Sequence, residues 1–175
     1  MKRIKAPLDK KTAASLTAGD SVLLTGFIYT ARDAAHKELC SLLEKGEPLP
    51  IDIKNEIIYF AGPCPAPEGR IIGSCGPTTS CRMDKYSPLL LDSGLLGMIG
   101  KGDRSDEVIA SVVKNGAVYF AATGGAGALI SKCVKSAEVV AFEYLGTEAI
   151  RRLYVEDMPL TVAIDSSGEN LYRNR

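Results

Sequence analysis

The chain has 175 residues, enough for one domain with a substantial hydrophobic core. Its 21 basic and 21 acidic side chains balance, which argues against a polyanionic partner or a charged membrane surface. The N-terminus lacks the apolar segment of a signal peptide, and no apolar run approaches the roughly 20 residues that span a bilayer. We therefore expect a single soluble, cytoplasmic domain over residues 1–175, with no nucleic-acid or membrane partner.

The cysteines do not form a recognisable pattern. An odd number of them at irregular spacing, with no C-x-x-C pair, argues against a disulfide framework and against structural zinc. The sequence therefore contains no evident ligand set for a metal ion. The five cysteines are Cys40, Cys64, Cys75, Cys81 and Cys133.

The first part of the chain predicts a polar start, a strand and a helix. Residues 1–6 are basic, and we expect a flexible solvated tail there, with a nucleic-acid-binding arm as the alternative. The apolar, β-branched run 21–28 predicts a buried strand. A helix with Thr30 as its N-cap is expected to run to about Lys45, because leucines recur in it at helical spacing.

Short strands and helices alternate through the middle of the chain. Strands are predicted at 56–60, 95–99 and 117–120. One helix is expected to begin at the two threonines Thr78-Thr79 and to run to about Leu91. Ser105 is the expected N-cap of another helix that ends near residue 115.

The last third of the chain is dominated by predicted strands. The glycine-rich residues 121–128 lack the third glycine of a dinucleotide fingerprint and any Gly-Lys-Thr/Ser, so we expect close helix–strand packing there. A helix to about Val134 follows. Strands are predicted at 137–142, 150–155 and 160–164, before a turn. The alternation predicts an α/β fold with a mixed sheet and short flanking helices.

The threonine stretch is the first candidate site. Two hydroxyls, the free N–H groups of a helix start and the guanidinium of Arg82, one turn after Thr79, would converge on one point. This combination describes half of a carboxylate pocket. The alternative is an ordinary N-cap with a solvated arginine.

Two further cations follow predicted strands. Arg32 comes after the strand at 21–28 with His36 one turn later, and Lys101 lies between two glycines after the strand at 95–99. The alternative for the first pair is a surface arginine and a hydrogen-bonded structural histidine. Ligand sites in α/β folds gather at such strand ends, and Arg32, Arg82 and Lys101 together suit a small dianion. No Cys–His or Ser–His–Asp pattern is present, so a partner with a Lewis acid would complete the site.

Three motifs resemble those of class I (iron–sulfur) fumarate hydratases, in their C-terminal domain or separate β subunit, which is similar to the β subunit of L-tartrate dehydratase. They are TARDAAH at residues 30–36, Gly76-Pro77-Thr78-Thr79 with Arg82 and Asp84, and GKGDRS at residues 100–105. The resemblance extends from about Pro7 to Tyr172.

The resemblance implies a swivelling β/β/α domain that closes over an α subunit or N-terminal domain. That partner would hold a [4Fe-4S] cluster through three cysteines of its own and leave one iron open to substrate. The cysteines of this chain would then be structural, with Cys75 and Cys81 as cluster ligands the alternative. A hetero-oligomer resembling α2β2 is implied, and the isolated chain could form a homodimer.

The resemblance also implies the site residues. Substrate contacts carry over to Arg32, Thr78, Thr79, Arg82 and Lys101. Thr78 is the candidate base, and because a hydroxyl is a weak base, it would need cations such as Lys101 to stabilise its alkoxide.

The expected function is the β subunit of a two-chain hydro-lyase that interconverts fumarate and (S)-malate. Asp103 stands where fumarases often carry Asn, whereas Arg104-Ser105 fits fumarase better than tartrate dehydratase. The alternatives are an L-tartrate dehydratase β subunit and a non-catalytic subunit that binds dicarboxylates or acts as a scaffold.

Overall fold

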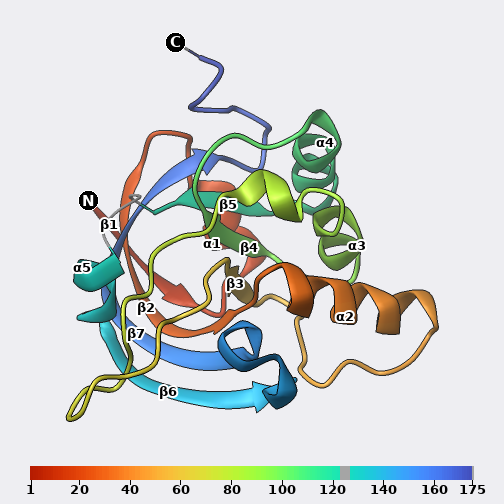
Figure 1. Ribbon diagram of the computed structural model, residues 1–175. Coiled ribbons are helices and arrows are strands. Elements are labelled where there is room, and N and C mark those ends of the chain that lie inside the picture. Colours follow the sequence, from red (N-terminus) through yellow and green to blue (C-terminus); the bar gives the residue numbers. More distant parts are fainter. Residues whose placement is uncertain (123–126, 175) are drawn as a thin grey trace.

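The computed structural model describes residues 1–122 and 127–174. Within them the chain forms one seven-stranded sheet with short helices around it (Figure 1). In chain order the strands are β1 (Lys2–Ala6), β2 (Ser21–Thr30), β3 (Ile57–Tyr59), β4 (Gly97–Gly100), β5 (Val118–Ala121), β6 (Val134–Ala141) and β7 (Ile150–Ile164).

The sheet is mixed and closes on itself. Its order is β1-β2-β3-β4-β5-β7-β6, with β1 to β5 parallel and β7 antiparallel to both β5 and β6. β7 also pairs antiparallel with β2, so β2, β3, β4, β5 and β7 form a barrel-like ring. The predicted α/β class with a mixed sheet and short helices is confirmed.

The helices are short and lie between the strands. Figure 1 shows α2, α3 and α4 together on one side of the sheet. The α-helices are α1 (Lys10–Ser15), α2 (Asp33–Glu44), α3 (Ser87–Asp92), α4 (Asp106–Asn115) and α5 (Gly127–Ser131), and the 3-10 helices are η1 (Ser80–Met83) and η2 (Glu143–Glu148). None of the helices in the described part of the chain has the length and apolar character needed to cross a membrane.

The prediction of a flexible tail over residues 1–6 is wrong, because Lys2–Ala6 form β1 alongside β2. The side chain of Ile4 is buried, so the strand has an apolar anchor among its charges. Lys2 lies 2.6 Å from a carboxylate oxygen of Asp20, and Arg3 lies 2.5 Å from one of Asp157. Two basic side chains of the suggested nucleic-acid arm therefore bind carboxylates of their own chain.

The strands predicted at 150–155 and 160–164 are one continuous strand, β7. The polar residues between them stay in the sheet, because β7 pairs with β2 from Thr161 back to Arg151. The register shifts between Leu24 and Gly26, and the backbone of Asp157 has a φ of 51°. A β-bulge of this kind bends a strand without ending it, here between the two predicted runs.

Two helix starts also differ from the prediction. Thr30 is the last residue of β2 rather than an N-cap, and its hydroxyl accepts a hydrogen bond from Arg151 N. The single helix expected from Thr78 to Leu91 is divided into η1 and α3. Thr79 occupies the N-cap position of η1 but makes no side-chain cap bond.

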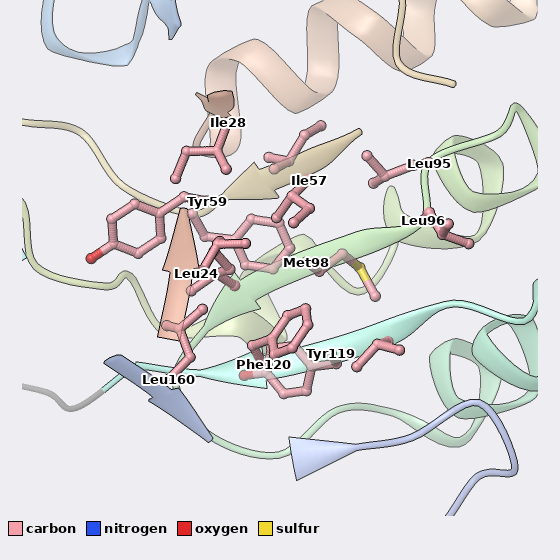
Figure 2. Close-up of a cluster of buried hydrophobic side chains, with 14 of the residues drawn as sticks. Leu24, Ile28, Ile57, Tyr59, Leu95, Leu96, Met98, Tyr119, Phe120 and Leu160 are labelled. Atoms are coloured by element: carbon pink, nitrogen blue, oxygen red, sulfur yellow. The ribbon is translucent and has the colours of Figure 1, made fainter. Parts of the chain in front are cut away.

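The core fills the ring of strands. Figure 2 shows large apolar side chains from β2, β3, β4, β5 and β7, and from the two residues before β4, packed against one another and almost inaccessible to solvent. Burial on this scale holds the parallel strands in register and brings their carboxyl ends to one edge. The labelled side chains are Leu24, Ile28, Ile57, Tyr59, Leu95, Leu96, Met98, Tyr119, Phe120 and Leu160.

Candidate dicarboxylate site

The segments that carry the predicted site residues begin side by side at the carboxyl ends of the parallel strands. Ala31 N donates to Tyr59 O at 3.0 Å, and Phe60 N donates to Ile99 O at 2.8 Å. These bonds continue the ladders past the ends of β2 and β3. Arg32 therefore follows β2, Lys101 follows β4, and the threonine stretch reaches this edge after β3.

Arg32 directly precedes α2, and its side chain lies against Gly62. A Cβ at position 62 would come 2.7 Å from Arg32 Cδ and 2.9 Å from its Nη1, so glycine leaves room for this arginine in its observed conformation. The Nε of Arg32 is buried and has no hydrogen-bond partner among the described residues. No carboxylate in this part of the chain lies within 4.0 Å of its guanidinium either.

The two threonines lie between the ends of β3 and β4. Thr78 N donates to Phe60 O at 2.7 Å, and Thr79 forms a parallel bridge with Lys101. Ser80 N donates to Lys101 O at 2.9 Å, which continues this bridge. The backbone thus joins Thr78, Thr79 and Lys101 in one place, while Thr79 is exposed and Thr78 half-buried.

The loop that carries Lys101 rests on a buried hydroxyl pair. Tyr119 OH donates to Ser80 Oγ at 2.7 Å and lies 2.8 Å from Gly102 O. Ser80 Oγ also occupies the space that a Cβ at Gly100 would need. Because these groups fix the backbone on both sides of Lys101, the position of this lysine is set by β5 as well as β4.

Arg82 projects from η1 and meets the first turn of α2. Its Nε and Nη2 both donate to Asp33 Oδ2, at 3.0 Å and 2.5 Å. The side chains of Arg82 and Asp33 are 47% and 37% exposed. Asp33 follows Arg32 directly, so this ion pair brings the segments of the two predicted arginines together. Asp33 was not among the predicted site residues, although an acidic residue directly after Arg32 is visible in the sequence.

Asp84 and Arg104, from two of the family motifs, bind each other. Arg104 Nε donates to Asp84 Oδ1 at 2.7 Å and Nη2 donates to Ser87 Oγ at 2.7 Å, while Ser105 N donates to Asp84 Oδ2 at 2.9 Å. The side chain of Arg104 is fully buried, and its guanidinium stacks on the ring of Tyr119. This pair therefore joins η1, α3 and the start of α4 and does not face a ligand.

Asp103 also joins separate segments of the fold, in this case residues near position 170 and the loop after β4. Its carboxylate accepts hydrogen bonds from Asn170 Nδ2 at 2.9 Å and from Arg173 Nε at 3.1 Å. Burial raises the pKa of Asp103, but these bonds and one from Arg104 N outweigh burial and lower the pKa below its usual value. Asp103 therefore ties residues 170–173 to the loop after β4.

His36 is structural, as the alternative in the sequence analysis allowed. Its Nδ1 donates to Arg32 O at 2.8 Å, and its ring packs edge-on against Phe60. Burial lowers the pKa of His36 to about 4, so the imidazole is neutral at neutral pH. Its Nε2 has no partner in the described residues. Through its hydrogen bond to Arg32 O, His36 holds the backbone of Arg32 in place.

The cysteines nearest the threonines differ in environment. Cys75 is buried, and burial raises the pKa of its thiol to about 12, whereas Cys81 is exposed. Cys75 N donates to Gly127 O at 3.3 Å, and a Cβ at Gly127 would collide with Ser74 Oγ. Residues 123–126 of the glycine-rich stretch lie outside the described residues. In the described ranges, no three His, Cys, Asp or Glu side chains gather as a metal-ligand set.

The arrangement collects positive charge and hydroxyls at one edge of the sheet. Arg32 and Lys101 have no carboxylate partner among residues 1–122 and 127–174, and Arg82 is only partly engaged. Uncompensated cations at a strand edge suit an anionic ligand, since each can give a charge-assisted hydrogen bond. The contacts of Arg32, Thr78, Thr79, Arg82 and Lys101 with a substrate remain a prediction.

Comparison with known proteins identifies the family. A family model described as the fumarase C-terminus matches residues 2–175. Fumarate hydratase 2 of Leishmania major is 38% identical over 173 residues, 97% of this chain and 30% of the relative. The anaerobic class I fumarate hydratase of Escherichia coli is 41% identical over 86% of this chain and 28% of its own length.

A shorter relative matches almost end to end. A protein of Methanocaldococcus jannaschii, provisionally named L(+)-tartrate dehydratase subunit beta, is 40% identical over 94% of this chain and 88% of its own. The chain thus spans under a third of the fumarate hydratases it matches but most of this subunit. The chain belongs to the fumarase C-terminus family.

Proposed function

We propose that this chain is the β subunit of a two-chain hydro-lyase that interconverts fumarate and (S)-malate. The observation that carries the proposal is that the segments with Arg32, the two threonines, Arg82 and Lys101 meet where β2, β3 and β4 end. A planar trans-dicarboxylate needs cations at two separated points, and segments from separate strands can provide them. Similarity to fumarate hydratases over nearly the whole chain supports this reaction.

Each site residue has a distinct proposed role. Arg32 and Arg82 bind the carboxylates of the substrate, and the hydroxyl of Thr79 helps to orient it. Lys101 lies beside the threonines through the Thr79 bridge, so its ammonium lowers the cost of a negative charge on the Thr78 hydroxyl. In the dehydration direction, Thr78 would first lose its hydroxyl proton to solvent, and the resulting alkoxide would take the proton from the substrate carbon.

The proposed partner is an α subunit that holds a [4Fe-4S] cluster. Such a cluster would supply a Lewis acid for the leaving hydroxyl. The described residues of this chain contain no ligand set that fits it, so we assign the cluster to the partner. The near end-to-end match to a separate beta subunit supports a two-chain assembly, which we propose to be of α2β2 type.

Dehydration of L-tartrate to oxaloacetate is the second candidate function. The observation that favours it is the 40% identity to the relative provisionally named as a tartrate dehydratase subunit, which is comparable to the identity with the fumarate hydratases. Both acids are small dianions, so the cations alone do not discriminate between them. A non-catalytic dicarboxylate-binding subunit is the third candidate.

Activity of the assembled enzyme tests the proposal. The chain should be co-expressed under anaerobic conditions with a cluster-bearing subunit, and turnover of fumarate and L-tartrate measured by absorbance. Turnover of fumarate by the complex, but by neither chain alone, is the expected result. Turnover of L-tartrate only would support the second candidate. If the cluster is intact and neither acid is turned over, the result would support the third candidate, a non-catalytic dicarboxylate-binding subunit.

Replacement of Arg82 tests the clamp. Arg82→Ala should lower kcat/KM for fumarate by at least about a hundredfold, because a charge-assisted carboxylate contact is worth a few kcal/mol. The melting temperature should stay nearly unchanged, since Arg82 is half-exposed. Arg3→Ala is the matched control, because it removes an ion pair of the same 2.5 Å length, with Asp157, that is more exposed and lies away from the site. Full activity of Arg82→Ala would show that the clamp is wrongly assigned.

A further inference from the structure

We infer that Asp33 is a positioning residue that holds the guanidinium of Arg82 with its free edge available for a ligand carboxylate. The inference rests on the proposed function, because it assumes that Arg82 binds the substrate. Asp33 itself touches no reacting atom in this scheme and acts only through Arg82.

The geometry of the ion pair leaves one edge of the guanidinium open. Nε and Nη2 form one side of the planar group, and both donate to the same oxygen, Asp33 Oδ2. The end formed by Nη1 and Nη2 remains, and Nη1 has no partner among the described residues. A carboxylate can take two parallel hydrogen bonds from that end. Asp33 therefore orients Arg82 without occupying the edge that a dicarboxylate needs.

Arg82 needs such support because its own element is weak. It lies on the four-residue helix η1, and its side chain is 47% exposed. A free arginine side chain loses about 2 kcal/mol of rotamer entropy when it is held in one conformation. If Asp33 already holds the Arg82 side chain before the ligand binds, part of this entropy is no longer lost on binding.

Asp33 is better anchored than Arg82. It is the first residue of the twelve-residue helix α2, where the helix dipole favours a negative charge. Its Oδ1 is buried and has no partner among the described residues. The adjoining backbone is tied by the two hydrogen bonds that His36 donates to Arg32 O. The backbone that carries this carboxylate is therefore well fixed, and the ion pair attaches η1 to it.

The same carboxylate also relieves repulsion within the site. Arg32 and Arg82 are brought together by their segments, and Arg32 has no carboxylate partner in the described ranges. A negative charge bound to Arg82 offsets part of the repulsion between Arg82 and Arg32 in the absence of substrate. A helix-capping role alone would predict effects on stability, whereas positioning predicts effects on substrate binding.

Steady-state kinetics of the assembled enzyme test the inference. Asp33→Asn should raise KM for fumarate about tenfold with a smaller change in kcat, and Asp33→Glu should recover part of the loss. The melting temperature should move little, because an exposed ion pair contributes about 1 kcal/mol or less. Asp157→Asn is the matched control, since it breaks an ion pair with Arg3 of the same 2.5 Å length, and its KM should not change.

A second readout does not depend on turnover. In the full chain labelled with 15N-arginine, the Nε–H signal of Arg82, assigned by its loss in Arg82→Lys, should shift on addition of fumarate. Asp33→Asn should weaken that shift and should speed exchange of this proton with water.

The outcomes separate the inference from the proposed function. Turnover in the wild-type complex with an unchanged KM in Asp33→Asn would overturn the inference alone. No turnover, but a fumarate-induced Arg82 shift that depends on Asp33, would overturn the hydro-lyase proposal and support the inference. An Arg82 signal that responds neither to fumarate nor to Asp33→Asn would overturn the inference whatever the activity.

Discussion

At the scale of single residues, the candidate site depends on close packing around glycine. Gly62 lies against the side chain of Arg32, and Gly100 makes room for Ser80 Oγ beneath Lys101. Both glycines follow or end a parallel strand, where the backbone approaches the ligand edge. A side chain at position 62 would push against Arg32 itself. A side chain at position 100 would displace Ser80, which supports the loop of Lys101.

Gly62→Ala should weaken substrate binding through Arg32. The new Cβ would meet Arg32 Cδ at 2.7 Å, and this long side chain can move where a backbone could not. We expect KM for fumarate to rise roughly tenfold with little change in melting temperature, because the loss falls on one charged contact. Kinetics and thermal melts of the assembled enzyme check this.

Arg32→Ala provides the background control for that prediction. Once the arginine is absent, Gly62→Ala should cause no further loss of fumarate binding, since coupled sites are non-additive. Additive losses would mean that Gly62 acts on something other than Arg32.

At the scale of elements, a buried ion pair holds the helices beside the site. Asp84 closes η1, and its carboxylate binds both the Arg104 side chain and the N-cap residue of α4. The side chain of Arg104 is 0% exposed and that of Asp84 is 16% exposed, so the pair is largely desolvated. Loss of one partner would therefore leave a buried charge without compensation.

Asp84→Ala should destabilise the fold by about 3–5 kcal/mol, the usual cost of a broken buried pair. Urea unfolding measures this. Asp92→Ala is the matched control, because Asp92 on α3 pairs with Lys114 on α4 at 3.3 Å with both side chains exposed. Its cost should stay within about 1 kcal/mol. Equal effects of the two variants would contradict the structural role of Asp84.

At the scale of the whole molecule, closure of the sheet between β2 and β7 encloses the core and buries residues of α2 against it. One of them is His36, which is fully buried. Burial lowers its pKa to about 4 from 6.5, so the folded state disfavours a protonated imidazole. The stability of the molecule is therefore tied to pH through this residue.

The free energy of unfolding should fall as the pH is lowered from 6.5 to 4. In this window the unfolded chain binds a proton at His36 and the folded chain does not, so stability rises with pH. The shift from 6.5 to about 4 corresponds to roughly 3 kcal/mol over the window. Urea unfolding at several pH values measures the slope.

His36→Gln is the control for the pH prediction. Its amide can still donate to Arg32 O but does not titrate, so the slope between pH 6.5 and 4 should largely disappear. A variant that retained the wild-type slope would assign the acid sensitivity to other groups.

Elements with strong local signals were predicted correctly. The apolar β-branched run of β2, the leucine spacing of α2 and the Ser105 cap of α4 each specify their own conformation, and the structure confirms all three. Prediction failed where partners distant in sequence decide the conformation. β1 is a strand because β2 lies beside it, and β7 continues through polar residues because it pairs with β2.

The candidate site likewise has features that the sequence predicted and features that depend on contacts between distant segments. The sequence by itself determined the family motifs and the order of cations after strands, since these depend on residue type and local periodicity. Only the tertiary structure decided that Asp33 binds Arg82, that Asp84 neutralises Arg104, and that Gly62 makes room for Arg32. Such pairings join segments 20 residues or more apart, and the parallel pairing of β2, β3 and β4, rather than any local pattern, brings them within contact distance.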